Sequence, residues 1–96
     1  MQLARFLNNV FKKDGFILVD ANSKSYIIGN PKSENPIKVK ILNKNLHYKL
    51  LLHPDLYFGE AYTDGEITIE NGTLTDFLDL SLMNFGRGDL NFFSYL

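Results

Sequence analysis

Residues 53–72, HPDLYFGEAYTDGEITIENG, place a short acidic segment directly before an alternating strand pattern. The segment Gly59–Gly65 (GEAYTDG), called the heptapeptide below, holds two carboxylates and a tyrosine between two glycines. Ile67 and Ile69 alternate with polar residues, which predicts a strand with one buried face and one solvated face. The heptapeptide can be a catalytic loop, a metal site or the joint between two structural elements, and its composition alone leaves these three open.

The pattern upstream of residue 53 predicts a helix followed by strands. Residues 2–13 carry apolar side chains at helical spacing on one face. Residues 16–20 and 25–29 are apolar runs around a polar turn, which is typical of a hairpin. Residues 30–36 contain two prolines and no apolar residue apart from them, which indicates a loop, and residues 37–43 alternate as a strand.

The pattern around residue 53 and downstream of it predicts three further helical segments. Residues 46–56 favour a short helix, with a buried strand as the alternative, and Pro54 predicts that any helix ends near His53. Residues 56–62 then predict one or two helical turns that end near Gly65. The last helix opens at Thr73, where Asp76 stands three residues later in the pattern of a capping box.

These elements predict an α+β fold with a small, mostly antiparallel sheet of about four to five strands backed by helices. We expect one accessory domain over residues 1–85, followed by a linker and the start of another element over residues 86–96. The reason is that the apolar segment LNFFSYL follows the flexible GRGD. The alternative is that this last segment docks on the core of its own domain.

Composition excludes several classes of protein. The chain has 96 residues, with 10 Lys and Arg against 11 Asp and Glu, so the basic excess that is typical of nucleic-acid binding is missing. The sequence contains no cysteine, which excludes disulfides and thiolate chemistry. No apolar run approaches the ~18–20 residues that span a bilayer, and the first residues lack a signal-peptide pattern. We therefore expect a cytoplasmic protein that can lie peripherally on the inner membrane.

Two pairs of side chains are candidates for acid–base chemistry or metal binding. Glu60 and Asp64 are four residues apart, so a helix places both carboxylates on one face, where they can exchange protons or bind a cation. Asp64 and Gly65 also form a turn dipeptide, which favours a structural role. His47 and His53 are six residues apart, a spacing that fits no common metal site.

Residues 54–80, PDLYFGEAYTDGEITIENGTLTDFLDL, resemble the N-terminal region of the cyclopropane-fatty-acyl-phospholipid synthases and their mycolic-acid-like relatives. In that family Pro-x-Leu, Gly-Glu-(Ala/Ser)-Tyr-x-Asp-Gly, a short strand and a leucine-rich helix recur in this order. Thr63 departs from the pattern at a position where methionine or valine is common. The resemblance covers residues 1–84, and the heptapeptide is its most specific part.

The resemblance implies that the parent protein is an S-adenosylmethionine-dependent methyltransferase that methylenates a cis double bond in a phospholipid acyl chain. The catalytic half carries the cofactor loop and the catalytic residues, so no catalytic, cofactor-binding or metal residue is assigned in this chain. The N-terminal half is similar to the sterol-carrier and nonspecific lipid-transfer fold. In this interpretation the heptapeptide is a structural joint, in which Gly59 and Gly65 permit tight turns and Tyr62 packs with its hydroxyl satisfied.

A gap between the helices and the sheet would hold an acyl chain. The side chains expected to face such a lipid are Phe6, Val10, Leu18, Ile41, Ile69 and Phe77. Lysines of the strand at 37–43 and of the end of the first helix are expected to add a basic patch for an anionic membrane. The expected partners are the catalytic domain of the same protein and a phospholipid surface. A stand-alone lipid carrier and a ligand-free interaction module are the alternatives.

Overall fold

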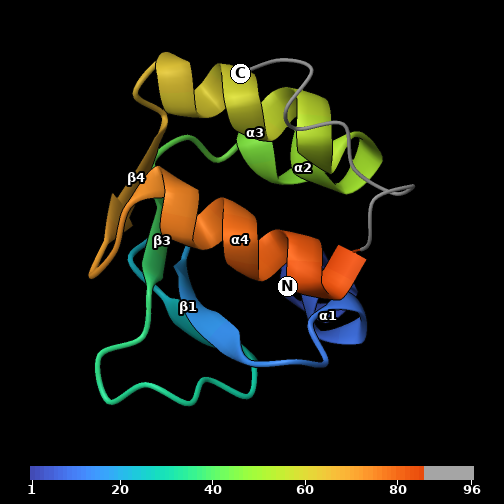
Figure 1. Cartoon of the computed structure of the whole chain (residues 1–96). Coiled ribbons are helices and arrows are strands. Elements are labelled where there is room, and N and C mark those ends of the chain that lie inside the picture. The colour runs from blue at the N-terminus through green and yellow to red at the C-terminus, as the bar shows by residue number, and fades with distance from the viewer. Residues whose placement is uncertain (86–96) are drawn as a thin grey trace.

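The structure, a computed structural model, describes residues 1–85 apart from the side chain of Asp55. Its architecture is α+β, with an open four-stranded sheet and four helices (Figure 1). The elements follow the chain in the order α1(Gln2–Val10), β1(Gly15–Val19), β2(Ser25–Gly29), β3(Lys38–Ile41), α2(Leu46–Leu52), α3(Pro54–Thr63), β4(Ile67–Glu70) and α4(Leu74–Phe85). The expected linker and following element at residues 86–96 lie outside the described residues.

The sheet is mixed, with the strand order β2-β1-β3-β4. β1 pairs with β2 and β3 pairs with β4 in the antiparallel sense, whereas β1 and β3 are parallel. The parallel pair arises because β2 ends opposite the start of β1, where Gly29 pairs with Gly15, and the following loop crosses to the other edge of β1 before β3 begins. Asp14 holds this loop, since its carboxylate accepts a hydrogen bond from the backbone N–H of Lys32 at 3.0 Å.

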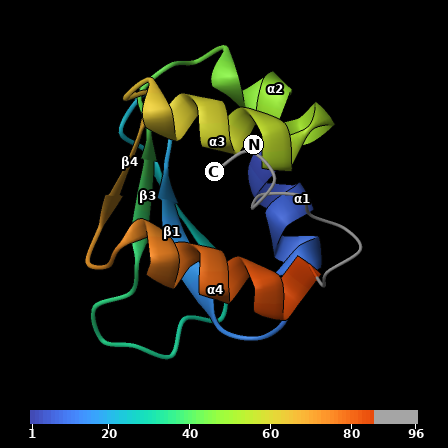
Figure 2. The same cartoon turned by 45° about the horizontal axis from the view of Figure 1, so that its top comes forward.

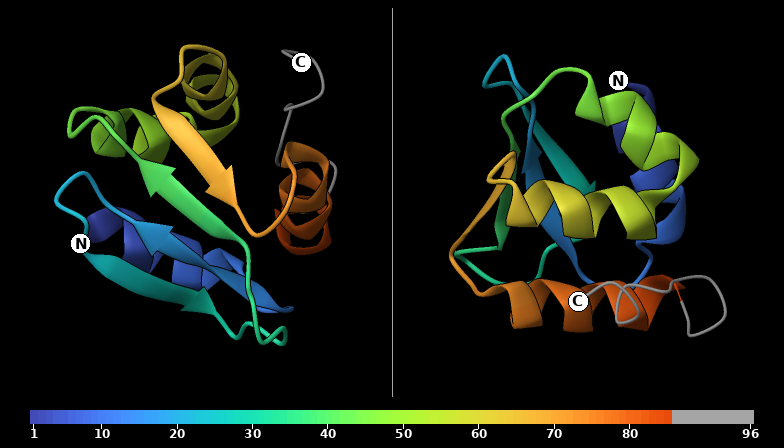
Figure 3. Two further views of the ribbon diagram at one scale, coloured as in Figure 1. Left: turned by 90° about the vertical axis from the view of Figure 1, so that its left-hand side faces the viewer. Right: turned by 90° about the horizontal axis from the view of Figure 1, so that it is seen from above.

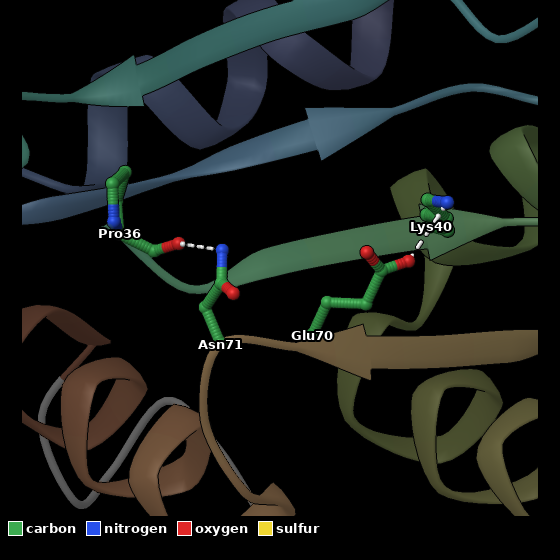
Figure 4. A network of polar contacts seen from close by, with 4 residues as sticks. All are labelled: Pro36, Lys40, Glu70 and Asn71. Atoms are coloured by element: carbon green, nitrogen blue, oxygen red, sulfur yellow. Dashed lines mark hydrogen bonds and ion pairs between the residues drawn. The ribbon is translucent and has the colours of Figure 1, made fainter.

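Two side-chain contacts join β3 and β4 around the Lys38–Glu70 end of their ladder (Figure 4). The amide of Asn71 donates to the backbone oxygen of Pro36 at 3.2 Å, just outside the paired residues. Lys40 and Glu70 form an ion pair of 2.7 Å across the solvated face of the two strands. Both partners are exposed to solvent, so this pair contributes little stability.

The helices all lie on one side of the sheet, and its other face is left without a covering layer (Figures 2 and 3). The strand residues that point toward the helices are buried, and they include Phe16, Leu18, Ile28, Val39, Ile41 and Ile67. A chain of aromatic contacts joins the layers. Phe16 of β1 lies 5.0 Å from Phe11 and 5.1 Å from Phe77 of α4, and Phe77 stacks on Phe58 of α3 at 5.1 Å, measured between ring centroids.

The first helix ends earlier than the apolar spacing predicts. α1 stops at Val10, and Phe11 already has the extended backbone angles φ −81° and ψ 91°. Asn84 of α4 causes the chain to leave the helix, because its side-chain oxygen accepts hydrogen bonds from the N–H groups of Lys12 at 2.8 Å and Lys13 at 2.7 Å. These two lysines therefore lie beyond the helix instead of in its last turn.

The predicted end of α2 and the predicted start of α4 are confirmed, whereas α3 starts at Pro54, two residues earlier than predicted, and is ten residues long. α2 ends at Leu52, His53 breaks the helical angles with ψ 77°, and Pro54 opens α3 at its first position, where its missing N–H costs nothing. The capping box of α4 is formed in both directions. The Thr73 N–H donates to the Asp76 carboxylate at 2.9 Å, and the Asp76 N–H donates to the Thr73 hydroxyl at 3.1 Å.

Candidate functional site

The heptapeptide forms the last part of α3, its C-terminal cap and the start of the turn into β4. Asp64 is the cap residue, and Gly65 follows it with φ +76°, in the left-handed region that glycine favours. The Gly65 N–H donates to the carbonyl of Tyr62 at 3.2 Å, and the Glu66 N–H donates to that of Ala61 at 2.8 Å. This pair of bonds is the Schellman motif, which satisfies helix carbonyls that otherwise have no partner.

The two glycines of the heptapeptide differ in their environment. Gly59 lies inside α3 and is buried, so the expectation that it permits a tight turn is wrong. The helix runs from Pro54 through Gly59 to Thr63 without interruption. The Thr63 hydroxyl donates to the Gly59 carbonyl at 3.0 Å, one turn earlier in the same helix.

The polar side chains of the heptapeptide point toward solvent. Tyr62 is 36% exposed, so its ring is less enclosed than the sequence predicts. Glu60 and Asp64 are also exposed and border a shallow surface hollow together with Leu56 and Thr63. Within residues 1–85, no cluster of three or more His, Cys, Asp or Glu residues has the geometry to hold a metal ion.

The interior between the sheet and the helices contains an apolar cavity of about 50 Å³. Every helix and every strand except β2 contributes to its wall. The lining residues are Leu3, Leu7, Phe11, Phe16, Leu18, Val39, Ile41, Leu50, Pro54, Phe58, Ile67, Phe77, Ser81 and Phe85. An empty cavity of about 150 Å³ accommodates benzene, and pockets for larger ligands begin at roughly 300 Å³. In this conformation the cavity is therefore too small for an acyl chain.

The six residues expected to face lipid occupy three different places. Leu18, Ile41 and Phe77 line the apolar cavity. Phe6 and Val10 instead border a separate surface hollow next to Asn84 and Phe85, and Ile69 is half-buried against the core. The structure thus brings three of the six together.

Ser81 is a lining residue that the sequence analysis did not single out. It is 1% exposed, and its hydroxyl donates to the backbone carbonyl of Phe77 at 2.9 Å. The cavity wall therefore stays apolar in character, because this buried polar group is already satisfied inside its own helix. Its position four residues after Phe77, on the buried face of α4, is the signal by which the sequence could have identified it.

Three polar side chains outside the cavity have a notable electrostatic or hydrogen-bonding environment. Partial burial acts to raise the pKa of Asp20, but hydrogen bonds from the N–H groups of Lys24 and Asn22 and from the Tyr26 hydroxyl outweigh it, so the pKa lies below its usual value. The hydrogen bond from Lys40 likewise lowers the pKa of Glu70. His47 is less well satisfied, since its Nε2 is buried without a hydrogen-bond partner among the described residues.

Neither protein-family models nor curated proteins match this chain. None of the helices within residues 1–85 has both the length and the apolar character that crossing a membrane requires.

Proposed function

We propose that this chain is the non-catalytic N-terminal domain of a cyclopropane-fatty-acyl-phospholipid synthase-like methyltransferase. It engages the phospholipid and positions the catalytic domain of the same protein. In this proposal the helices and sheet have the arrangement of the sterol-carrier and lipid-transfer fold. The protein acts in the cytoplasm, peripherally at the inner membrane.

One observation carries the proposal. The segment that resembles the synthases, residues 54–80, folds as the consecutive elements α3, β4 and α4. Each of these elements contributes an aromatic or branched side chain to the apolar cavity: Phe58, Ile67 and Phe77. The family-like segment therefore forms part of the wall of the apolar cavity, which supports a role beside an acyl substrate.

The size of the cavity favours engagement of phospholipid at the surface over complete enclosure. A stand-alone lipid carrier, the second candidate, needs space for a whole acyl chain, and the cavity of about 50 Å³ provides room for about one water molecule or a small group. The apolar lining supports the carrier only if α3 and α4 move apart. A ligand-free interaction module requires no cavity at all.

S-adenosylmethionine is the cofactor of the parent enzyme in this proposal, and the catalytic domain binds it. The coding sequence beyond Leu96 tests this directly. We expect a strand, a glycine-rich loop and a helix to follow, as in S-adenosylmethionine-binding domains. A stop codon immediately after Leu96 would contradict the proposal and favour the carrier.

Calorimetry provides a second test. The intact chain is expected to give no heat of binding with S-adenosylmethionine, because a glycine-rich phosphate or adenosine loop does not occur in its sequence. Micromolar binding would place cofactor chemistry in this domain and overturn its accessory role.

A further inference from the structure

Helix α2 exposes large apolar side chains to solvent. Leu52 is 73% exposed and Tyr48 is 68% exposed, and these are the two highest values among the large apolar side chains of residues 1–85. The two residues are four positions apart, so they lie on the same face of the helix, one turn from each other. Exposed side chains of this kind, adjacent on one face, mark an interaction surface more often than isolated ones do.

The exposed face of α2 is not needed to hold the helix in place. Its opposite face buries Leu46, which is 3% exposed, and Leu50, which is 7% exposed and lines the apolar cavity. α2 packs against α1 and α3. Tyr48 and Leu52 therefore have no part in the core.

The segment that contains α2 carries only basic charges of its own, and the carboxylate of Asp20 interacts with His47 from outside the segment. Residues 42–53 contain Lys44, Lys49 and two histidines but no Asp or Glu, although the whole chain has a net charge of −1. Both lysines are exposed and form no ion pair with another side chain that the structure describes. The ammonium group of Lys49 lies 5.6 Å from the ring centre of Tyr57 in α3.

The basic patch expected on the strand at 37–43 differs, because one of its lysines forms an ion pair. There the charge of Lys40 is balanced by Glu70 at 2.7 Å. Ile27 of β2 is 67% exposed and lies in the row of residues that runs through Ile17 to Lys38, where Lys38 stands opposite Glu70. The outer sheet face is thus a natural control.

We propose that α2 is the surface through which the domain lies on an anionic phospholipid membrane. Tyr48 and Leu52 enter the boundary between headgroups and acyl chains, and Lys44 and Lys49 face the lipid phosphates. The fit is chemical: an aromatic ring with a polar tip, an aliphatic side chain and flanking ammonium groups are the composition of interfacial helices.

This inference rests on the proposed engagement of phospholipid and specifies where it occurs. It also gives the cavity a position relative to the membrane, because Leu50 on the buried face of α2 and Pro54 at the start of α3 both line that cavity. The helix that contacts lipid is therefore one wall of the apolar interior.

Co-sedimentation with vesicles tests the proposal. The intact chain is mixed with vesicles of phosphatidylglycerol and phosphatidylethanolamine, and in parallel with phosphatidylcholine vesicles, at low salt. We expect the double variant Tyr48→Ser/Leu52→Ser to lower the partition coefficient on anionic vesicles by at least about tenfold. Lys44→Gln/Lys49→Gln should lower it by about fivefold for each lysine, since one charge near an anionic surface contributes ~1 kcal/mol.

The matched controls are Ile27→Ser on the outer sheet face and Lys12→Gln/Lys13→Gln beyond the end of α1. Both are expected to bind like the unaltered chain. All substituted side chains are exposed, so circular dichroism and the thermal midpoint should show unchanged folding. The two α2 variants act through different chemistry, so either one tests the surface if the other folds poorly.

Three outcomes would overturn the inference, and they separate it from the proposed function. If the unaltered chain binds and the α2 variants bind equally well, the domain engages lipid through another surface. If no chain binds either type of vesicle, phospholipid engagement itself fails. If the α2 variants lose self-association in sedimentation velocity but keep vesicle binding, the α2 face is an interface between two copies.

Discussion

At Gly65 the requirement for glycine comes from the backbone conformation and not from steric contacts. It has φ +76°, and an added Cβ would meet no heavy atom within 4 Å. A substitution there therefore changes the backbone energy without a steric clash. An L-residue in the left-handed region costs roughly 1–2 kcal/mol, and the lower entropy of the unfolded alanine chain returns about 0.4–1 kcal/mol.

The net expectation for Gly65→Ala is a loss of about 1 kcal/mol in the free energy of unfolding, and Gly65→Val should lose more because its side chain is β-branched. For a domain of this size a loss of 1 kcal/mol lowers the melting temperature by roughly 4–8 °C. Urea denaturation followed by circular dichroism measures the change, and Gly65→Asn is the matched control. Asparagine tolerates the left-handed region, so it should cost clearly less than alanine.

An unchanged denaturation midpoint for Gly65→Ala would refute the reasoning. It would mean that the Schellman cap of α3 does not require the left-handed angle at residue 65, or that losing the hydrogen bonds of this cap does not change the free energy of unfolding. Equal losses for alanine and asparagine would also refute it, since backbone strain could then not be the cause.

The remaining predictions concern other backbone and polar contacts. Gly29→Ala should lower the free energy of unfolding by about 2 kcal/mol or more, a larger loss than for Gly65→Ala in the same assay. The alanine would have to adopt φ +71°, and its Cβ would lie 2.5 Å from the Asp14 carbonyl oxygen. Equal losses for the two variants would contradict this. Thr73→Ala should cost about 1 kcal/mol by removing the acceptor of the N-cap bond, and Thr73→Ser should restore it; an alanine variant as stable as serine would contradict the cap. The lowered pKa of Asp20 makes its carboxylate stabilising above the unfolded value near pH 4, and this contribution is lost as the pH falls through the folded pKa. Asp20→Asn should therefore flatten the loss of stability on the acid side, and an unchanged pH profile from thermal melts would argue against it.

The sequence predicted the elements well where the signal is local. Alternation identified β3 and β4, and the short-range rules for Pro54 and for the Thr73–Asp76 pair placed the helix boundaries. These signals depend on neighbouring residues, so no knowledge of the tertiary structure is needed to interpret them.

The parts that could not be predicted depend on contacts between distant residues. α1 ends early because of Asn84, which is more than seventy positions away in the chain. The parallel pairing of β1 and β3 follows from the path of a loop, which apolar alternation does not encode. The strand pattern alone is equally compatible with an all-antiparallel sheet.

The candidate site shows the same division. The positions of Leu18, Ile41 and Phe77 on buried faces could be inferred from periodicity, and all three line the cavity. The exposed face of α2 could not, because LHYKLLL is a short apolar run in which spacing does not reveal whether Tyr48 or Leu52 is covered. Only the position of α2 on α1 and α3 leaves these two side chains free.

Binding of the intact chain to anionic phospholipid vesicles tests phospholipid engagement most directly. The bound fraction is measured by co-sedimentation as the salt concentration rises. We expect binding at low salt that weakens steadily with added salt, because the lysine contribution is screened while the apolar contribution of Tyr48 and Leu52 remains. No binding to anionic vesicles at low salt would contradict the role in phospholipid engagement.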